Sequence, residues 1–497
     1  MSDNHSQLSR YNDDGASDLL RCTTELALDF LASVERRSVG VQAQPTGVAP
    51  AFDRHLPEQG DDPRRVIETL ARVADPGLVA SAGPRYFGFV TGGSLPTALA
   101  ADWLTSAWDQ NACLHVMSPA AAEVEALAAE WLLDLLGLPA GTSVGFTTGA
   151  TMANFTALAA ARHAVLARVG WDVAQYGLAT APPITVVVGA HVHASVLAAL
   201  QLLGFGRAQL RHVAVDTQGR MRADALQATL AAIDGPLIVC AQAGNVCSGA
   251  CDPLAAIADA VAARQGWLHV DGAFGLWAAV TPMLRPLVDG LARADSWATD
   301  AHKWLNVPYD SGVVFVRDPA AHRAATTIGA SYLVAAGAAE RDGSNWVPEL
   351  SRRARGFTVY AALRALGRAG LRSLVERSCA QARQMAGLLA AADGVEILND
   401  VVLNQVLVRF TPTRPDRGAA STDADTFTRA VIRQVQDDGT CWLGGATWHG
   451  LAVMRISFSN WATSADDVAR SASAILRCAR TIDELWAESA ARERMHA

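Results

Sequence analysis

A lysine and an aspartate stand beside two apolar segments of this sequence. Lys303 lies in Asp300-Ala301-His302-Lys303-Trp304, shortly before the strand-like run Gly312–Val316, and Asp271 ends the upstream run Trp267–Asp271. Lysine can form a Schiff base with an aldehyde, and a carboxylate can keep a pyridine nitrogen protonated. The pair predicts a pyridoxal phosphate site. The alternative is a lysine that reaches solvent from a strand end and an aspartate that caps a helix.

The length and charge of the chain limit the class of protein. Its 497 residues exceed one ordinary domain, so two or three lobes around a large core are expected. Forty-nine acidic residues outnumber 41 Lys and Arg, which gives a net charge of −8. An acidic chain without a basic cluster argues against nucleic-acid binding. The expected partner is a small molecule.

Cysteine usage and the N-terminus bear on the compartment. The eight cysteines are mostly dispersed, and Cys247 and Cys251 lack the second pair or the histidines that a zinc site needs. No metal is expected, and reduced thiols indicate a cytoplasmic protein. Residues 1–18 are polar and acidic rather than basic and then apolar, so no signal peptide is expected.

One uncharged stretch has the length of a membrane span. Residues 177–206 contain no Asp, Glu, Lys or Arg. Pro182, Pro183 and Gly189 interrupt it, and the sequence predicts a buried strand at 184–188 followed by a helix at 195–203. No membrane partner is therefore expected.

Strands and helical stretches alternate from about residue 95 to residue 318. This order indicates an α/β fold with a mostly parallel sheet wrapped by helices. The expected domains are an N-terminal helical segment (1–94), a cofactor-binding large domain (95–325) and a smaller C-terminal α+β domain with a mobile loop (326–497). The predicted strands are 184–188, 210–215, 237–241, Trp267–Asp271, Gly312–Val316, 401–410 and 451–458.

Five motifs carry a resemblance to a known family. They are Ser118-Pro119-Ala120-Ala121-Ala122-Glu123-Val124-Glu125, the Thr-Thr-Gly-Ala-Thr turn ending at Thr151, His193-Ala194-Ser195-Val196, the strand ending in Asp271, and His302-Lys303-Trp304. In this order the chain resembles the group II pyridoxal-phosphate-dependent amino acid decarboxylases from about residue 85 to residue 458. That family includes aromatic-L-amino-acid, glutamate and diaminobutyrate decarboxylases. The resemblance implies the fold type I transferase-like architecture and pyridoxal 5'-phosphate as cofactor.

The resemblance assigns residues around that cofactor. Ala150 and Thr151 are expected at the phosphate, which backbone N–H groups at a helix N-terminus can bind; a simple Thr cap is the alternative. His193 resembles the histidine that stacks on the pyridine ring, and Ala273 the small residue on the other ring face. His302 resembles the histidine on the phosphate side, with a purely structural hydrogen bond as the alternative. The expected catalytic residues are Lys303, His193 and Asp271.

Two positions depart from the family pattern, and one assignment has a competitor. Asn245 stands where a threonine usually lies near the cofactor, although its amide can still form a hydrogen bond. Asp300 stands where aromatic decarboxylases have a phosphate-contacting asparagine, and a carboxylate there would repel the phosphate unless it turned toward a donor. His191 competes with His193 as the stacking residue.

The catalytic loop departs most from the family. Aromatic decarboxylases carry a tyrosine there, shortly before a tryptophan and an Arg-Arg stretch. Aligning Trp346 and Arg352-Arg353 puts Gly343 at that place, whereas Tyr332 matches a different tyrosine after the cofactor domain. Without the tyrosine, proton donation would fall to water, His193 or Lys303, or the site would react with oxygen.

The expected reaction is pyridoxal-phosphate-dependent decarboxylation of an α-amino acid, through a Lys303 Schiff base and a quinonoid intermediate. An aromatic amino acid is among the candidate substrates, and Arg455 is a candidate for binding the substrate carboxylate, with an interlobe salt bridge as its alternative. Oxygen-dependent deamination or aldehyde formation, transamination, carbon–carbon lysis and cofactor binding without turnover stay open. The resemblance also implies a homodimer whose site is completed by the partner's segment 343–355.

Overall fold

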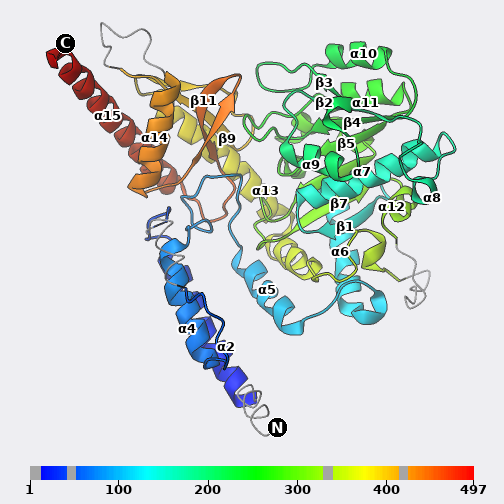
Figure 1. The fold of residues 1–497 in the computed structure, drawn as a ribbon, viewed down its shortest axis with the longest axis horizontal. Helices are drawn as coiled ribbons and strands as arrows, with labels where there is room; N and C mark the ends of the chain where they lie inside the picture. The colour runs from blue at the N-terminus through cyan, green and yellow to red at the C-terminus, as the bar shows by residue number, and fades with distance from the viewer. Residues whose placement is uncertain (1–12, 42–51, 328–339, 414–423, 497) are drawn as a thin grey trace.

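The computed structural model describes residues 13–41, 52–327, 340–413 and 424–496, which form two sheets surrounded by helices (Figure 1). The larger sheet has seven strands in the order β1-β7-β6-β5-β4-β2-β3. Strand β7 is antiparallel to both neighbours and the other pairs are parallel, so the predicted mostly parallel α/β sheet is confirmed. The strands are β1 (Ser143–Thr147), β2 (Thr185–Gly189), β3 (Leu210–Val213), β4 (Leu237–Gln242), β5 (Trp267–Asp271), β6 (Ser296–Asp300) and β7 (Gly312–Val316).

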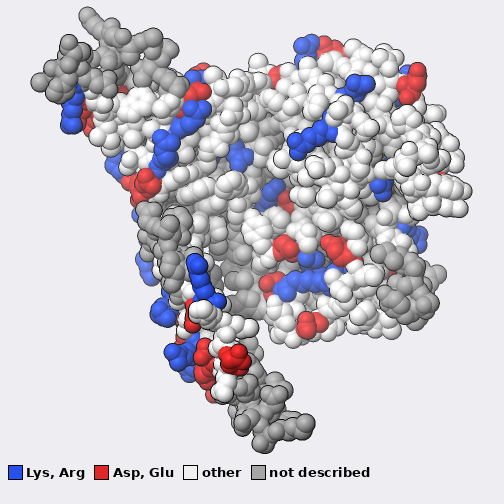
Figure 2. Space-filling view, in the orientation of Figure 1, with Lys and Arg blue, Asp and Glu red and all other residues white. Residues whose placement is uncertain are grey.

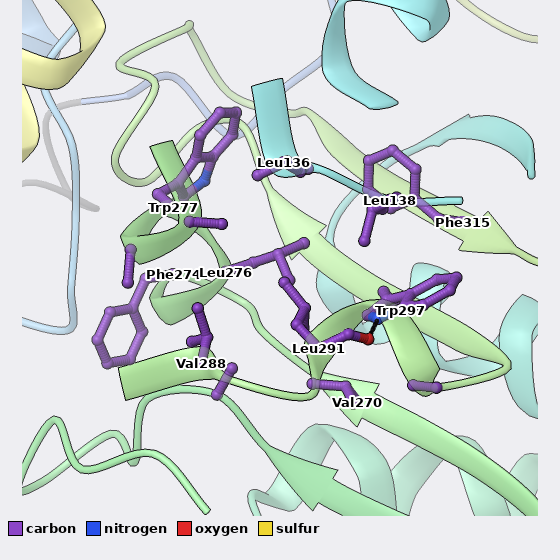
Figure 3. Close-up of a cluster of buried hydrophobic side chains, with 14 of the residues drawn as sticks. Leu136, Leu138, Val270, Phe274, Leu276, Trp277, Val288, Leu291, Trp297 and Phe315 are labelled. Atoms are coloured by element: carbon purple, nitrogen blue, oxygen red, sulfur yellow. Dashed lines mark hydrogen bonds between the residues drawn. The ribbon is translucent and has the colours of Figure 1, made fainter. Parts of the chain in front are cut away.

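Both faces of this sheet are buried under helices. On β2, Val187 belongs to the hydrophobic cluster that includes α6 and α11, whereas Val186 and Val188 belong to the cluster that includes α7 and α9. Figure 3 shows part of the first cluster, with Val270 and Trp297 among its residues. Two buried faces require apolar residues at consecutive positions, which explains the β-branched runs of the sequence. The helices named here are α6 (Pro119–Leu136), α7 (Ala150–Ala167), α9 (Ala194–Leu202) and α11 (Leu254–Ala262).

The smaller sheet is antiparallel, with strand order β10-β11-β9-β8. Strands β8, β9 and β11 share one hydrophobic core with helices α13, α14 and α15 (Figure 1). This arrangement agrees with the α+β domain expected from the sequence, while the domain limits at 94 and 325 stay predictions. The elements are α13 (Gly356–Ala390), β8 (Val395–Ile397), β9 (Gln405–Phe410), α14 (Ala424–Asp438), β10 (Gly444–Trp448), β11 (Leu451–Ser457) and α15 (Ala465–His496).

The N-terminal helices form an arm that projects from the body in Figure 1. Helices α2 (Asp13–Ser33) and α4 (Pro63–Ala74) pack against each other. The chain then returns to the loop that carries Lys303, where the Leu95 N–H donates to the Asn306 carbonyl at 2.8 Å. At Gly92, an added Cβ would lie 1.9 Å from the Lys303 carbonyl oxygen, so only glycine allows this close approach. Within the described ranges, no helix is long and apolar enough to cross a membrane.

The segment predicted to be a mobile catalytic loop is packed on the large domain. Gly343 is buried in the short helix η9 (Gly343–Asn345), and an added Cβ would lie 2.4 Å from both Ala112 O and Arg352 Nη1. Arg352 also donates to the Glu125 carboxylate at 2.7 Å, and each of these side chains is 1% exposed. This arrangement leaves no room for a side chain at position 343. That Gly343 takes the place of the family's loop tyrosine stays a prediction. Tyr332 lies outside the described residues.

These contacts also bear on the partner loop predicted from the sequence. Arg353 donates to Asp102 Oδ1 at 2.7 Å, and the Arg341 guanidinium lies 3.7 Å from the Glu125 carboxylate. The segment 341–355 is thus bound to the large domain of its own chain. Completion of a partner subunit's site by the segment 343–355 stays a prediction.

Candidate active site

The candidate residues follow strands whose carboxyl ends meet at one edge of the large sheet (Figure 1). Strand β6 ends at Asp300, shortly before Lys303, and its parallel neighbour β5 ends at Asp271. Strand β1 leads to Ala150 at the start of α7, and β2 leads to His193 at the start of α9. Ligands of open α/β sheets bind outside the carboxyl ends of the strands. This edge is the candidate active site.

Lys303 is the only lysine of the chain, since the other 40 of its 41 Lys and Arg residues are arginine. Arginine cannot take its place in Schiff-base chemistry, because a guanidinium does not lose its proton in proteins. The Lys303 Nζ lies 2.8 Å from Asp300 Oδ2, and the side chain is 17% exposed. The presence of a single lysine is a further signal in the sequence, independent of the spacing of the motifs. It leaves one side chain able to bind an aldehyde cofactor covalently.

The Asp300 carboxylate gathers several groups at the start of helix α7. Its Oδ1 accepts from the Ala150 backbone N–H at 2.5 Å and lies 3.4 Å from His302 Nε2. Gly149 keeps this space open, because an added Cβ would lie 3.3 Å from Asp300 Oδ1. An oxyanion thus occupies the N-terminus of an 18-residue helix. Helix N-termini also bind phosphate, so this is the position expected for the phosphate of the cofactor.

Asp271 is buried at the same edge of the sheet. Burial raises the pKa of its carboxyl, while the charges of His193 and Lys303 and a backbone hydrogen bond from Ala273 act in the opposite direction. The Ala273 N–H donates to Asp271 Oδ1 at 3.2 Å. A protonated pyridine nitrogen would be a further cationic partner and would favour the ionised carboxylate.

His193 is the N-cap residue of α9. Its Nδ1 accepts from the Ser195 backbone N–H at 3.2 Å and lies 2.7 Å from Ser195 Oγ. Burial lowers the pKa of His193 most; the charge of Asp271 raises it, and those of Lys303 and Arg455 lower it further. The ring is therefore neutral near pH 7, and it lies within electrostatic range of both predicted cofactor-binding residues.

Asn245 has a structural role that its sequence position did not predict. Its Oδ1 accepts from the backbone N–H groups of Cys247 and Ser248, at 2.9 and 3.2 Å. These bonds hold the turn after β4, and the side chain is 3% exposed. A cofactor contact by Asn245 would depend on Nδ2, which faces Gly219. That contact stays a prediction.

The remaining predicted residues occupy different positions around the edge. Thr151 is exposed on the first turn of α7, and Ala273 is partly buried beside Asp271. His191, the competitor of His193, packs against Trp448 and His449 with ring centroids 5.0 and 4.9 Å away. His191 therefore takes part in the packing between the large and the small domain.

Arg455 reaches the site from strand β11 of the small domain. Its charge lowers the pKa of His193, which places the guanidinium within electrostatic range of that ring. Its Nη1 donates to the Val246 carbonyl at 3.0 Å, and no carboxylate of the described residues forms a salt bridge with it. Although burial lowers its pKa, the guanidinium keeps its charge. This cation can bind a carboxylate brought by a substrate.

Aromatic residues lie beside these groups. The Tyr309 ring lies 4.4 Å from the His302 ring. Burial, with a smaller contribution from Tyr309, raises the pKa of Tyr86 to about 12, against the opposite effect of the Arg455 charge. Tyr86 also stacks on Trp442, with centroids 5.1 Å apart and planes 9° apart. The sequence had singled out neither Tyr86 nor Tyr309.

Sequence reasoning also missed the polar residues behind His193. Ser195, Asn154 and His269 form hydrogen bonds with one another in the core between α7, α9 and β5. The sequence contains one weak signal for His269. It lies two residues from Asp271 on a strand, so the two side chains share a face of the sheet.

The described residues fit pyridoxal phosphate. They provide one amine, a buried carboxylate and a helix N-terminus that already binds an oxyanion. One feature opposes the fit, because the Asp300 carboxylate occupies the N–H group that a phosphate would use. Asp300 would have to turn away or yield its donors when the phosphate binds.

Comparison with known proteins decides the family. Residues 45–411 match the family model described as "Pyridoxal-dependent decarboxylase conserved domain". The chain belongs to this family. The decarboxylase is thus a pyridoxal-phosphate-dependent enzyme of fold type I that removes the carboxylate of an amino acid.

Relatives cover most of the decarboxylase. Tryptophan decarboxylase 1 of Oryza sativa subsp. japonica is 29% identical over 468 residues, with 90% of each chain covered. The L-2,4-diaminobutyrate decarboxylase of Rhizobium meliloti (strain 1021) is 32% identical over 394 residues, with 78% of this chain and 76% of the relative covered. The solved structure of Oryza sativa TDC with PLP and tryptamine superposes with a TM-score of 0.87 at 25% identity, and covers 95% of this chain and 99% of that chain.

Proposed function

We propose that the decarboxylase converts an aromatic α-amino acid to its amine, with Lys303 as the covalent attachment point of the cofactor. The observation that carries this assignment is the position of the only lysine, whose Nζ lies 2.8 Å from Asp300 at the carboxyl edge of the sheet. Bound pyridoxal phosphate would supply an electron sink for the carbon that loses its carboxylate.

The residues around Lys303 have distinct roles in this proposal. Asp271 keeps the ring nitrogen protonated, and His193 and Ala273 cover the two faces of the ring. Ala150, Thr151 and His302 hold the phosphate, and Asn245 is a further candidate contact. Arg455 binds the substrate carboxylate, because it is a buried cation near His193 that forms no salt bridge with the described residues.

An aromatic substrate is supported by the surroundings of Arg455. Tyr86, which responds to the charge of Arg455, stacks on Trp442, and the ring of Phe89 lies 5.5 Å from Trp442. Phe89 is 64% exposed, so its ring is available for contact with a ligand. Aromatic pairs contribute about 0.5–1.5 kcal/mol beyond the buried area. The tryptophan decarboxylase from rice, with its 29% identity, points to the same substrate class.

A homodimer is supported by exposed apolar residues on the N-terminal arm. Leu20 and Leu28 of α2 are 66% and 56% exposed, and Val66 and Leu70 of α4 are 48% and 53% exposed. A projecting helical pair with apolar residues in solvent is typical of an association surface. A second copy of the chain would bury them. The face drawn in Figure 2 mixes basic and acidic residues, so it has no large basic surface for a polyanion.

A cytoplasmic location is supported by the cysteines. All eight are free thiols, and seven of them are buried. Burial raises the pKa of several, including Cys240, Cys251 and Cys441, and so keeps these thiols protonated and unreactive. Free thiols suit a reducing compartment.

The experiment that tests the function measures products across a panel of amino acids. Purified enzyme loaded with pyridoxal phosphate is incubated with aromatic, acidic and basic amino acids, and carbon dioxide, amine, ammonia and peroxide are measured. Aromatic substrates should give amine and carbon dioxide in equal amounts. Preference for a diaminobutyrate-type substrate would contradict the aromatic assignment, and ammonia with peroxide would contradict simple decarboxylation. The oxygen-dependent alternative raised from Gly343 stays open until these products are measured.

A further inference from the structure

A continuous row of side-chain hydrogen bonds leads from the core of the large domain to His193. It joins elements β5, β6, α7 and α9, and the members behind His193 are between 0% and 9% exposed. The row consists of Trp267 Nε1–Ser296 Oγ (2.9 Å), Ser296 Oγ–His269 Nδ1 (2.9 Å), His269 Nε2–Asn154 Oδ1 (2.9 Å), Asn154 Nδ2–Ser195 Oγ (3.3 Å) and Ser195 Oγ–His193 Nδ1 (2.7 Å).

The direction of donation in the core follows from the groups that can act in one role only. The indole of Trp267 can only donate, so the Ser296 oxygen accepts from it. A serine oxygen can accept a second hydrogen bond, so this contact alone does not assign the roles of Ser296 and His269. The Asn154 Oδ1 can only accept, so His269 donates to it from Nε2, and Nδ1 of the neutral ring accepts from the Ser296 hydroxyl. Burial lowers the pKa of His269 to about 3, which keeps the ring neutral and able to do both.

The last member fixes the same direction independently. The Ser195 backbone N–H donates to His193 Nδ1 at 3.2 Å, and a backbone amide cannot reverse its role. Nδ1 must therefore be an acceptor and carry no proton. The Asn154 amide donates to Ser195 Oγ, which leaves the Ser195 hydroxyl proton for His193 Nδ1. With the Asn154 amide in this orientation, every bond of the row is satisfied in one direction.

We propose that Ser195, Asn154 and His269 are positioning residues that hold His193 as the neutral tautomer with its single proton on Nε2. The inference rests on the proposed place of His193 beside the cofactor. With Nδ1 occupied twice, Nε2–H is the ring group left for donating a hydrogen bond in the site. The charged groups that face the ring are Asp271 and Asp300 from the large sheet, Lys303 from the following loop and Arg455 from the small domain.

The isosteric substitution Asn154→Asp reverses the bond between residue 154 and Ser195. A carboxylate has no N–H for Ser195, and it accepts from both His269 and the Ser195 hydroxyl. The Ser195 oxygen then turns a lone pair toward His193 Nδ1, which leaves the Ser195 backbone N–H as the one remaining donor to Nδ1 and lets this nitrogen take a proton more readily. The pKa of His193 should rise by about one unit or more. A second variant, Asn154→Leu, gives Ser195 no polar partner and should leave His193 as a mixture of tautomers.

The test measures the ring directly and then the reaction. Full-length protein carrying 13C-labelled histidine is examined by NMR with and without pyridoxal phosphate, and His193→Gln assigns the resonance of His193. Wild-type protein should show the Nε2–H tautomer in both forms. In the Asn154→Asp enzyme, kcat should fall at least about tenfold, with the acid limb of its pH profile moved to higher pH and KM within about twofold.

Two controls separate this role from general damage to the fold. Asn404→Asp makes the same change at another fully buried amide, which bonds to Phe458 O and Ser459 Oγ, and should leave the His193 resonance unchanged. Ser195→Thr retains the hydroxyl and should keep the wild-type tautomer. A proton on Nδ1 in the wild type, or an unchanged His193 resonance in both Asn154 variants while they remain folded, would overturn the proposal. These outcomes do not depend on which products the enzyme forms, so they are distinct from a failure of the proposed function.

Discussion

Lys303 and Asp300 form an ion pair across three residues of chain, with Nζ 2.8 Å from Oδ2, at the carboxyl end of strand β6. The same carboxylate accepts the N–H of Ala150 at the start of α7. Asp300 thus binds the amine that would react with the aldehyde of pyridoxal phosphate and also the backbone N–H that would bind its phosphate. This double occupancy gives the site a direct electrostatic test.

Replacing Asp300 by asparagine should strengthen cofactor binding. The substitution removes a negative charge beside the phosphate and releases the Lys303 amine from its ion pair, so the Kd of pyridoxal phosphate should fall roughly tenfold. Titration of the apoenzyme, followed by absorbance, measures the Kd. Asp259→Asn, at an exposed ion pair with Arg293, is the control and should leave it unchanged. Weaker cofactor binding by Asp300→Asn would show that the carboxylate supports the cofactor instead.

The substitution Asp271→Asn should preserve cofactor binding and reduce the rate. An amide does not hold the ring nitrogen protonated, so kcat should fall by about two to three orders of magnitude, the scale seen when one preorganised electrostatic group is lost. Steady-state kinetics at saturating cofactor measures the effect. A near-normal kcat would mean that another acid performs this role.

The buried Glu125–Arg352 pair should control stability. Both side chains are 1% exposed, and Glu125→Gln would leave the guanidinium without its counter-charge. Loss of one partner of a buried pair costs about 3–5 kcal/mol, whereas an exposed pair contributes no more than about 1 kcal/mol. Thermal unfolding should therefore occur at a clearly lower temperature in Glu125→Gln than in Asp259→Asn. Equal melting temperatures would show that the 341–355 segment does not depend on this pair.

Acid should destabilise the fold through two buried histidines. Burial lowers the pKa of His269 and of His322 to about 3, whereas an unfolded histidine titrates near about 6.5. Between these values the unfolded chain binds protons that the native chain does not. Stability should therefore fall as the pH decreases below about 6.5, by about 1.4 kcal/mol per pH unit for each histidine, and should not depend on them above that pH.

Denaturant titrations above and below pH 6.5 measure this dependence. His322→Gln removes one of the two groups, so the loss of stability with acid should be less steep in the variant by about 1.4 kcal/mol per pH unit. An identical pH dependence in the wild type and the variant would rule out His322 as a contributor.

The sequence predicted the parts of the fold that depend on residue pattern. Strands β4, β5 and β7 were evident because strands buried on both faces need continuous apolar runs. Strand β6, which reads Ser-Trp-Ala-Thr-Asp, was not predicted as a strand, because its polar residues resemble a loop and become satisfied only in the tertiary structure. For example, Ser296 Oγ pairs with Trp267 and His269.

The motifs predicted which residue types the site contains, but not the three-dimensional contacts of these residues. Lys303 and Asp271 were found because their chemistry is specific and each follows an apolar strand. The burial of Gly343 could not be found, because the oxygen of Ala112 and the guanidinium of Arg352 exclude a side chain only in three dimensions. The role of Asn154 likewise depends on contacts between α7, α9 and β5.

The most direct test of the central claim is borohydride reduction of the cofactor-loaded enzyme, followed by peptide mass spectrometry. Because Lys303 is the only lysine, one internal peptide can carry a reduced pyridoxyl group. We predict that Lys303 carries it, and that Lys303→Arg, which keeps the positive charge beside Asp300, loses both the adduct and amine formation. An active Lys303→Arg enzyme, or a wild-type enzyme that is active without a reducible adduct at Lys303, would contradict the account.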